Sequence, residues 1–292
     1  MGKLKLAVII PTFNRKDYLS SLLSNLIEQD VKDVDLDVIV VVDGSTDGTL
    51  ELLDNVYPEV SVVLGDGKWW WTKSINEGIE VARNRDNSLF LLMNDDTIIE
   101  PSFLRLMIEG YYSSGKGVLG AISVTDSSPH KIFFSGIKKV KWGIAKFYRY
   151  HKHFTIYDSS IRGVHPSLFL PGRGMMFDLD VLNKIGMFSE DKFPQYYSDF
   201  DFSYRAFINN FNTNVIYDSP IYSFVKLTAE GNKSNSTFIQ LLRSFSKPMS
   251  SNNFKRTYLF YKRHAGPLFF ASVGFHYIRI IGSFFLIKFK KG

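Results

Sequence analysis

The chain has 292 residues, 45% apolar and 22% charged, which is typical of a globular protein with a buried core. It contains no cysteine, which excludes a disulfide scaffold, a thiolate zinc site, an iron–sulfur cluster and a cysteine nucleophile. The net charge of +6 hides a division: residues 226–292 carry 12 basic residues and one acid, whereas the rest carries 23 bases and 28 acids. A mildly acidic body with a basic tail argues against nucleic acid as a partner.

The first hundred residues alternate short β-branched runs with helical patterns. Strands are predicted at residues 6–10, 37–42, 60–64 and 88–93, and helices at 15–29, 49–56, 72–83 and 101–112. This alternation predicts an α/β fold, Rossmann-like, with a mostly parallel sheet covered by helices on both faces. The apolar run before Pro11 is too short for a secretion signal.

The rest of the chain has a weaker pattern. Residues 117–180 indicate short strands and loops, and a helix is predicted at 199–209. Polar sequence at 229–237 is typical of a linker and leads into the basic tail.

Acidic residues follow two of the predicted strands, where parallel sheets bind ligands. Asp43 ends one strand, and Asp95 and Asp96 follow another. Adjacent carboxylates stay ionised cheaply only beside a cation or hydrogen-bond donors, and oxygen ligands suit Mg²⁺ or Mn²⁺. The alternative is a solvated turn in which an aspartate caps the next helix.

The loop that begins at Asp43 has two interpretations besides a plain turn. Its spacing partly matches an EF-hand, but an EF-hand loop follows a helix, and here a strand precedes it. The other interpretation is a strand-end acid that accepts a hydrogen bond from a base or ribose, with Asp47 capping the next helix. No glycine-rich phosphate loop of the dinucleotide or P-loop type follows any strand.

Three further features are candidates for a site. Three consecutive tryptophans at 69–71 cannot all face one core, so at least one is expected to line a pocket or loop; stacking on a sugar or base and core filling both stay open. Asp201 can pair with Arg205 one helical turn on, whereas Asp199 has no such basic neighbour and is the freer carboxylate. Arg173, in a tight loop, either meets an anionic group or lies on the surface.

Together these segments resemble the ordered motifs of family 2 glycosyltransferases. The matching stretches are residues 11–15, 42–49, 94–97, 172–176 and 198–201, and the resemblance covers about residues 5–210. It implies the GT-A fold and an inverting enzyme that uses nucleotide-diphospho-sugars. Residues 65–78 further resemble the bacterial branch that makes rhamnosyl and galactofuranosyl linkages.

The resemblance assigns roles residue by residue. It implies that Asp199 is the catalytic base and that Asp96, with Asp95, holds Mg²⁺ or Mn²⁺. The acceptor side would comprise Gly172, Arg173, Gly174 and Asp201. The nucleotide-sugar would be bound by Pro11, Thr12, Asn14, Arg15, Asp43, Ser45, Trp70, Trp71, Lys73, Asn76 and Asp95.

Three departures from the family pattern leave an alternative open. Val42 stands where the family often has a second acid, Ser198 replaces the glutamate before the base, and residues 219–228 lack the histidine with which some relatives bind metal. The alternative is a non-catalytic nucleotide-sugar-binding or scaffold protein of the same fold. A nucleotidyltransferase is disfavoured because its phosphate loop is missing.

The tail contains a long apolar helix with a narrow polar stripe. Residues 267–289 are largely apolar, with Lys288 near the end and a stripe of Ser272, His276, Arg279 and Ser283 on one side. The stripe favours a helix lying in the membrane plane, near anionic headgroups, over one that spans it. The alternatives are packing on the catalytic domain or on a second copy as a homodimer.

Together these inferences predict the domains, the reaction and the cellular location of the protein. Residues 1–228 form a catalytic domain, with a nucleotide-sugar half to about 115 and an acceptor half from 116, and residues 229–292 form a helical tail. The enzyme would transfer a hexosyl or deoxyhexosyl group from a UDP- or dTDP-linked donor to a glycan or polyprenyl-linked acceptor of a cell-surface polysaccharide. It would be cytoplasmic and peripheral at the inner face of the cell membrane.

Overall fold

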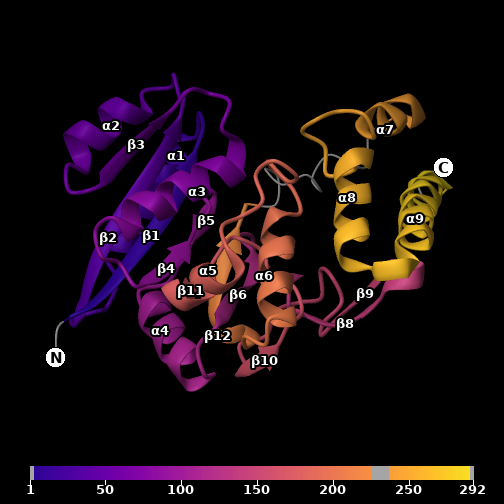
Figure 1. The fold of residues 1–292 in the computed structure, drawn as a ribbon. Coiled ribbons are helices and arrows are strands. Elements are labelled where there is room, and N and C mark those ends of the chain that lie inside the picture. Colours follow the sequence, from indigo (N-terminus) through magenta and orange to yellow (C-terminus); the bar gives the residue numbers. More distant parts are fainter. Residues whose placement is uncertain (1–2, 225–236, 290–292) are drawn as a thin grey trace.

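The computed structural model describes residues 3–224 and 237–289. Its centre is a ten-stranded sheet in the order β10-β12-β6-β11-β4-β1-β2-β3, with β5 paired to β12 and β7 to β6 (Figure 1). The first four strands are parallel: β1 (Leu4–Thr12), β2 (Val34–Asp43), β3 (Ser61–Gly65) and β4 (Leu89–Leu92). The expected mostly parallel sheet is therefore confirmed.

The second half of the sheet mixes strand directions. β11 (Met175–Asp178) runs antiparallel between β4 and β6 (Val118–Thr125), and β12 (Thr213–Ser223) runs parallel to β6. β10 (Val164–Pro166), β5 (Thr97–Ile98) and β7 (Ile132–Phe134) are short antiparallel additions. A separate hairpin of β8 (Ile137–Lys141) and β9 (Lys146–Arg149) is joined by the short helix η1 (Trp142–Ile144).

Helices cover both faces because the strands are apolar on both sides. In β1, Leu6, Val8 and Ile10 pack against α1 (Lys16–Ile27), α2 (Thr49–Val56) and α4 (Phe103–Ser113). Ala7 and Ile9 face α3 (Trp70–Arg83), α5 (Leu179–Ile185) and α6 (Ser198–Ile208). The predicted elements of the first hundred residues are all present, with ends that differ by a few residues; α5 and β12 were not predicted.

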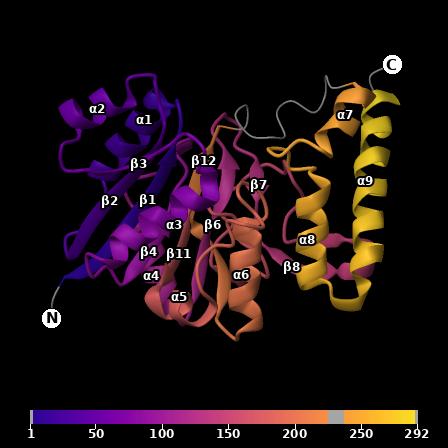
Figure 2. The same cartoon turned by 45° about the horizontal axis from the view of Figure 1, so that its top comes forward.

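The tail is helical, as expected, and packs beside the second half of the sheet (Figure 2). It comprises α7 (Phe238–Ser244), α8 (Phe254–His264), the short η4 (Gly266–Leu268) and α9 (Phe269–Phe289). Phe260 and Tyr261 of α8 are buried in the same apolar cluster as Phe169 and Phe193. The domain boundary expected near residue 228 lies outside the described residues.

One stretch of the described chain, Gly266–Lys288, is long and apolar enough to cross a membrane, judged by length and composition alone. Only 11% of an 18-residue apolar window within it is buried. Which side of the helix faces the protein therefore bears on whether it could cross a membrane.

Candidate active site

A cavity of about 560 Å³ opens where β1, β2 and β4 end. Its floor is formed by residues at or just beyond those strand ends, and its opposite wall by the loop before β11 and the start of α6. Met249, from the tail, closes part of the rim. The lining residues are Pro11, Thr12, Phe13, Arg15, Asp43, Gly67, Trp70, Trp71, Ser74, Asn94, Asp95, Asp96, Pro171, Gly172, Arg173, Gln195, Tyr196, Asp199 and Met249.

Arg15 bridges the two adjacent aspartates on the cavity floor. Its Nη1 lies 2.9 Å from Asp95 Oδ1 and 3.1 Å from Asp96 Oδ2. Burial raises the pKa of Asp95 to about 6, although the charge of Arg15 acts in the opposite direction. The guanidinium therefore supplies the positive charge that two buried carboxylates need.

The same pair has the properties of a divalent-cation site. Asp96 Oδ1 is buried and has no hydrogen-bond partner among the described residues. Those residues contain no cluster of three or more His, Asp or Glu side chains, so a cation here would need further oxygen ligands from phosphates or water. Two carboxylates with substrate phosphates is a common ligand set for Mg²⁺.

Asp43 organises the loop that carries the tryptophans. Its Oδ1 accepts the Gly67 N–H at 2.8 Å, and its Oδ2 accepts the N–H groups of Trp69 and Trp70 at 3.0 and 2.9 Å. The carboxylate is buried and also lines the cavity. Asp43 follows a strand, so the EF-hand interpretation is wrong. Asp47 accepts the hydroxyl of Thr49, the first residue of α2, and also the N–H of Lys16, at the start of α1.

Trp71 connects three segments that surround the cavity. Its backbone N–H donates to Gln195 Oε1 at 3.0 Å, and its indole N–H donates to Asn94 Oδ1 at 3.1 Å. Its ring lies so close to Gly172 that a β-carbon there would be 2.2 Å from the indole. Trp70 and Trp71 line the cavity, as at least one tryptophan was predicted to do, and Trp69 packs against the core.

Asp199 lies on the opposite wall, in the first turn of α6. Its Oδ2 accepts the Gly172 N–H at 3.1 Å, and its Oδ1 accepts the Phe200 N–H at 2.9 Å. Burial raises the pKa of Asp199, although these two hydrogen bonds and the charge of Arg173 partly oppose the effect. Arg173 has a buried Nη1 without a partner among the described residues. The carboxylate is therefore fixed in position and more basic than an exposed aspartate.

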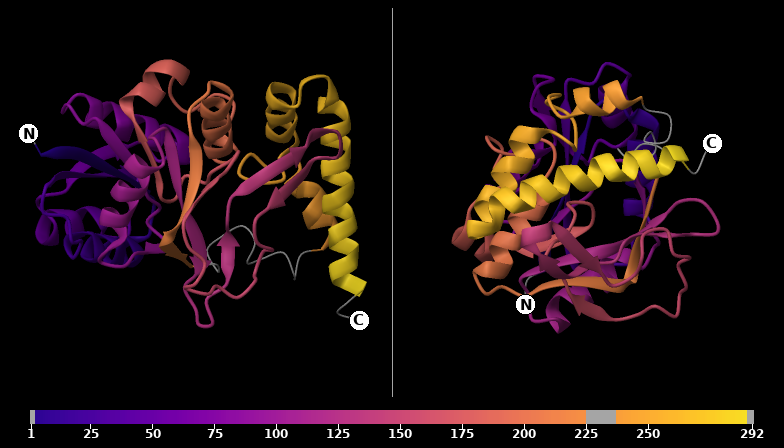
Figure 3. Two further views of the ribbon diagram at one scale, coloured as in Figure 1. Left: turned by 90° about the horizontal axis from the view of Figure 1, so that it is seen from below. Right: turned by 90° about the vertical axis from the view of Figure 1, so that its right-hand side faces the viewer.

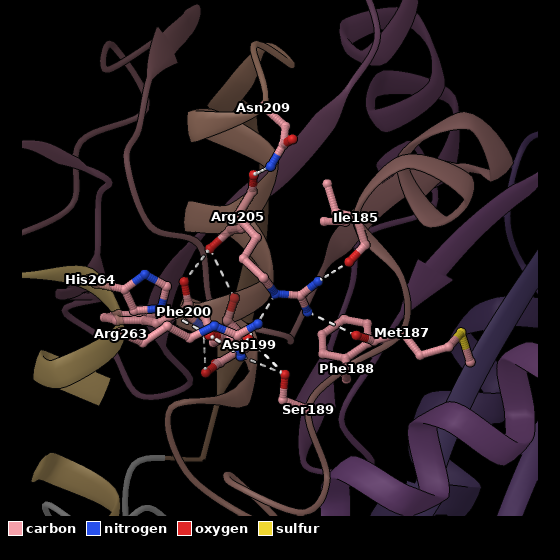
Figure 4. Close-up of polar contacts among 12 residues, drawn as sticks. Ile185, Met187, Phe188, Ser189, Asp199, Phe200, Arg205, Asn209, Arg263 and His264 are labelled. Atoms are coloured by element: carbon pink, nitrogen blue, oxygen red, sulfur yellow. Dashed lines mark hydrogen bonds and ion pairs between the residues drawn. The ribbon is translucent and has the colours of Figure 1, made fainter. Parts of the chain in front are cut away.

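Asp201, expected on the acceptor side, lies outside the cavity lining and within a cluster of buried ion pairs. It is fully buried and accepts hydrogen bonds from Arg205 Nε at 2.9 Å and His264 Nε2 at 2.8 Å. Arg263 Nη1 lies 3.0 Å from it, and Ser189 Oγ donates to it at 3.2 Å. These partners converge on α6 in Figure 4. Burial acts to raise the pKa of Asp201, but the His264 hydrogen bond and the charges of Arg205 and Arg263 outweigh it, so the pKa is lowered.

Five other predicted residues also lie outside the cavity lining. Asn14 and Ser45 join two loops: the Asn14 N–H donates to Ser45 Oγ at 3.0 Å, and Asn14 Oδ1 accepts the Thr46 N–H at 2.7 Å. Lys73 Nζ lies 4.9 Å from the ring of Trp69. None of these residues lines the cavity, and Asn14 and Ser45 hold together two loops beside it.

Asn76 and Gly174 also lie outside the cavity lining and contact other parts of the fold. Asn76 Nδ2 donates to the Phe188 carbonyl at 3.0 Å and to Glu190 Oε2 at 2.8 Å, which ties α3 to the loop before α6. Gly174 adopts a φ of 69°, and a β-carbon there would lie 2.6 Å from Ile221. It is needed for close packing inside the sheet.

The cavity also contains residues that the sequence did not single out, among them Ser74, Asn94, Gln195, Tyr196 and Met249. Asn94 belongs to a motif whose aspartates were recognised, and Ser74 follows the tryptophans by one helical turn. Met249 belongs to the tail, and no local pattern marks it. Gln195 and Tyr196 precede α6 and could have been found only by extending the motif that contains Asp199.

A parallel sheet with acids at its strand ends and a second acid on the facing helix defines a GT-A protein. Residues 7–180, more than half of the chain, match the sequence profile described as Glycosyl transferase family 2. The chain therefore belongs to glycosyl transferase family 2.

Individual relatives match only in part. Poly(ribitol-phosphate) beta-N-acetylglucosaminyltransferase TarS of Staphylococcus aureus (strain Mu50) is 41% identical over 51 residues, which is 18% of this chain and 9% of TarS. A Methanococcus voltae dolichyl N-acetyl-alpha-D-glucosaminyl phosphate 3-beta-D-2,3-diacetamido-2,3-dideoxy-beta-D-glucuronosyltransferase is 22% identical over 192 residues, 61% of this chain and 57% of that protein. The chain thus spans less than two thirds of either relative.

Solved structures agree on the fold. The crystal structure of S. aureus TarS 1-349 superposes with a TM-score of 0.53 at 18% identity, covering 89% of this chain and 70% of that one. The same fragment in complex with UDP gives a TM-score of 0.52, with the same identity and coverage.

Proposed function

We propose that the protein is an inverting glycosyltransferase that moves a hexosyl or deoxyhexosyl group from a UDP- or dTDP-sugar to an acceptor hydroxyl. The observation that carries the proposal is the cavity, which places Asp95 and Asp96 on its floor and Asp199 on its facing wall. An acid pair at the strand ends suits a diphosphate with its cation, and a separate carboxylate suits deprotonation of an acceptor.

The donor diphosphate would lie over Arg15, Asp95 and Asp96. Mg²⁺ or Mn²⁺ held by the two aspartates would neutralise negative charge on the leaving diphosphate. Arg15 would then pair with a phosphate oxygen, because its present partners would bind the cation. Trp70 and Trp71 offer flat apolar surfaces for the sugar or the base.

Asp199 would act as the general base. The acceptor oxygen forms a bond to the anomeric carbon while the bond from that carbon to the diphosphate breaks, and the hydroxyl proton passes to Asp199. The hydrogen bonds from Gly172 and Phe200 fix the carboxylate, and its raised pKa makes it a stronger base. Attack from the face opposite the diphosphate inverts the anomeric configuration.

The acceptor is proposed to be a glycan or a polyprenyl-linked sugar of a cell-surface polysaccharide, made on the cytoplasmic side of the membrane. Support comes from the family and from the two relatives, whose names refer to poly(ribitol-phosphate) and to a dolichyl-linked sugar phosphate. Arg173, with its unpaired buried Nη1, suits an acceptor that carries negative charge.

A donor panel tests the proposal. Purified protein with Mn²⁺ is mixed with UDP- and dTDP-sugars one at a time. The unfolding temperature is measured on heating, and the release of UDP or dTDP is measured in a separate assay of the folded protein. Either the UDP-sugars or the dTDP-sugars should raise the unfolding temperature, and one donor of that set should be hydrolysed or should transfer its sugar. Stabilisation by no nucleotide would contradict the proposal; binding of a donor without hydrolysis or transfer to any acceptor would favour a non-catalytic nucleotide-sugar-binding protein.

A further inference from the structure

The polar stripe of α9 faces the protein. Ser272 is fully buried, and its Oγ donates to the Trp142 carbonyl at 2.7 Å. His276 Nδ1 lies 3.2 Å from the hydroxyl of Tyr261, in α8. The guanidinium of Arg279 donates to the carbonyls of Ile144 and Ala145, beside η1. Three of the four residues of the stripe are thus hydrogen-bonded to the protein, and the fourth, Ser283, is exposed.

The side of α9 that faces away from the protein is apolar and exposed. We call its side chains Phe270, Phe275, Ile278, Phe285 and Leu286 the outer face; Phe270 is 69% exposed, and Ile278 and Leu286 are each 64% exposed. The right-hand view of Figure 3 shows α9 running along the outside of the molecule. Ile239 of α7, 62% exposed, continues this surface, and the Phe238 ring of α7 lies 5.6 Å from that of Phe285. An apolar surface of this extent indicates an interaction site.

The charges beside the outer face have one sign. Residues 237–289 contain eight lysines and arginines and no acid. Arg243 of α7 and Lys288 at the end of α9 are exposed, and Lys288 Nζ lies 5.8 Å from the centre of the Phe284 ring. A second copy docked symmetrically would bring two such basic sets together, whereas a surface of anionic headgroups complements them.

We propose that the outer face inserts at the headgroup–acyl boundary of a membrane containing anionic lipid, with α9 parallel to the membrane plane. A spanning orientation is disfavoured because Ser272, His276 and Arg279 bind α9 to α8 and η1, which would have to enter the hydrocarbon with it. The in-plane helix inferred from sequence is retained, but three residues of its polar stripe, Ser272, His276 and Arg279, bind the protein. The inference concerns the partner of the tail and holds whether or not the proposed sugar transfer occurs.

Vesicle flotation of the full chain tests this inference. The probes are vesicles of phosphatidylcholine alone and of phosphatidylcholine with about 30% phosphatidylglycerol, an anionic share that gives basic residues a surface potential to respond to. The wild-type protein should float with the anionic vesicles, and the double variant Phe275→Ser/Ile278→Ser should lose at least tenfold in binding. The matched control Ile27→Ser/Ile208→Ser, which replaces exposed side chains of α1 and α6, should float like the wild type.

Three outcomes would overturn the proposal. One is equal flotation of the wild type and the Phe275→Ser/Ile278→Ser variant, and another is equal binding to both vesicle types. The third is a wild-type dimer by light scattering that the variant converts to a monomer, which would assign the outer face to a second copy. An unchanged circular dichroism melt confirms that the variant is folded. A failure to bind any nucleotide would count against the proposed function and leave the flotation result intact.

Discussion

The indole of Trp71 lies against Gly172, and no side chain larger than hydrogen fits between the ring and the backbone at that position. The backbone N–H of the same glycine donates to Asp199 Oδ2. One contact therefore connects the tryptophan loop on one wall of the cavity to the carboxylate on the other.

Gly172→Ala should lower transfer activity strongly. The added methyl group would lie 2.2 Å from the indole, so either the ring or the loop must move, and the hydrogen bond to Asp199 moves with it. A displacement of about 1 Å at a reacting group costs about 100-fold in rate. Steady-state kinetics measure the loss. Gly143→Ala, whose β-carbon would lie 3.8 Å from Leu268, is the control and should keep wild-type kinetics.

Arg15→Gln should bind Mn²⁺ more tightly in the absence of nucleotide. The guanidinium competes with a cation for Asp95 and Asp96, and a charged hydrogen bond is worth about 1.5–3 kcal/mol, so the gain should be about tenfold or more. Quenching of tryptophan fluorescence measures the binding, because Trp70 and Trp71 line the cavity. Arg105→Gln, which breaks an exposed pair with Glu109, should leave the affinity unchanged. Equal affinities in all three proteins would remove Asp95 and Asp96 from the proposed metal site.

Asp43→Asn should destabilise the tryptophan loop. The carboxylate accepts three backbone N–H groups, and an amide would turn its own N–H₂ toward at least one of these donors. We expect a loss of about 1–3 kcal/mol in the free energy of unfolding, with weaker UDP or dTDP binding. Urea denaturation and a nucleotide titration measure the two effects. Asp54→Asn, at an exposed position in α2, should change neither; an unaltered Asp43→Asn protein would disprove the loop-organising role.

Asp199→Asn should keep donor binding and lose transfer. A positioned general base contributes about 10²–10⁴-fold, so the turnover rate should fall by that factor. Since burial raises the pKa of Asp199 and the base acts deprotonated, the wild-type rate should fall with decreasing pH at values above the usual aspartate range. The residual rate of Asp199→Asn should not decrease with falling pH in this way. The control is Asp180→Asn, at an exposed position on α5, which should keep full activity. Full activity of Asp199→Asn would exclude Asp199 as the base.

Asp201→Asn should reduce stability more than it affects donor binding. Removing one partner of a buried ion pair costs about 3–5 kcal/mol, because Arg205 would stay buried without its counter-charge. Urea denaturation at pH 7 measures the loss. Glu109→Gln breaks an exposed pair of the same helical spacing and should cost about 0.3–0.5 kcal/mol.

The pH dependence of that difference follows from the lowered pKa of Asp201. A carboxyl group with a lower pKa in the folded state contributes stability that is complete above its unfolded pKa of about 3.9 and disappears as the pH falls through the folded value. The gap between wild type and Asp201→Asn should therefore be constant near neutrality and shrink below about pH 4. A gap that widens in acid would contradict the assignment.

Sequence reasoning succeeded where the information is local. The apolar runs of β1, β2 and β4 predicted a two-sided core, and the acids directly after them had to lie at one edge of a parallel sheet. β12 escaped prediction because Asp218, Ser219 and Pro220 interrupt its apolar pattern, and the pairing register with β6 shifts between Ile216 and Ile221.

Contacts between distant segments could not be read from the sequence. The helical spacing predicted the Asp201–Arg205 pair, which the structure confirms, but not His264, because only the folded tail brings that residue to α6. Asn76 was assigned to the nucleotide because it belongs to a motif near the tryptophans. Its side chain instead binds Phe188 and Glu190, more than a hundred residues later in the chain.

The way the tail is attached bears on how this protein should be handled in practice. Met249 forms part of the cavity rim, and Arg263 and His264 bind Asp201 two residues from Asp199. Deleting residues 237–289 would therefore remove part of the cavity rim and two partners of Asp201, on the helix that carries the proposed base Asp199. Polar substitutions at Phe275 and Ile278 would leave these contacts intact, since both side chains are exposed on α9 and neither lines the cavity.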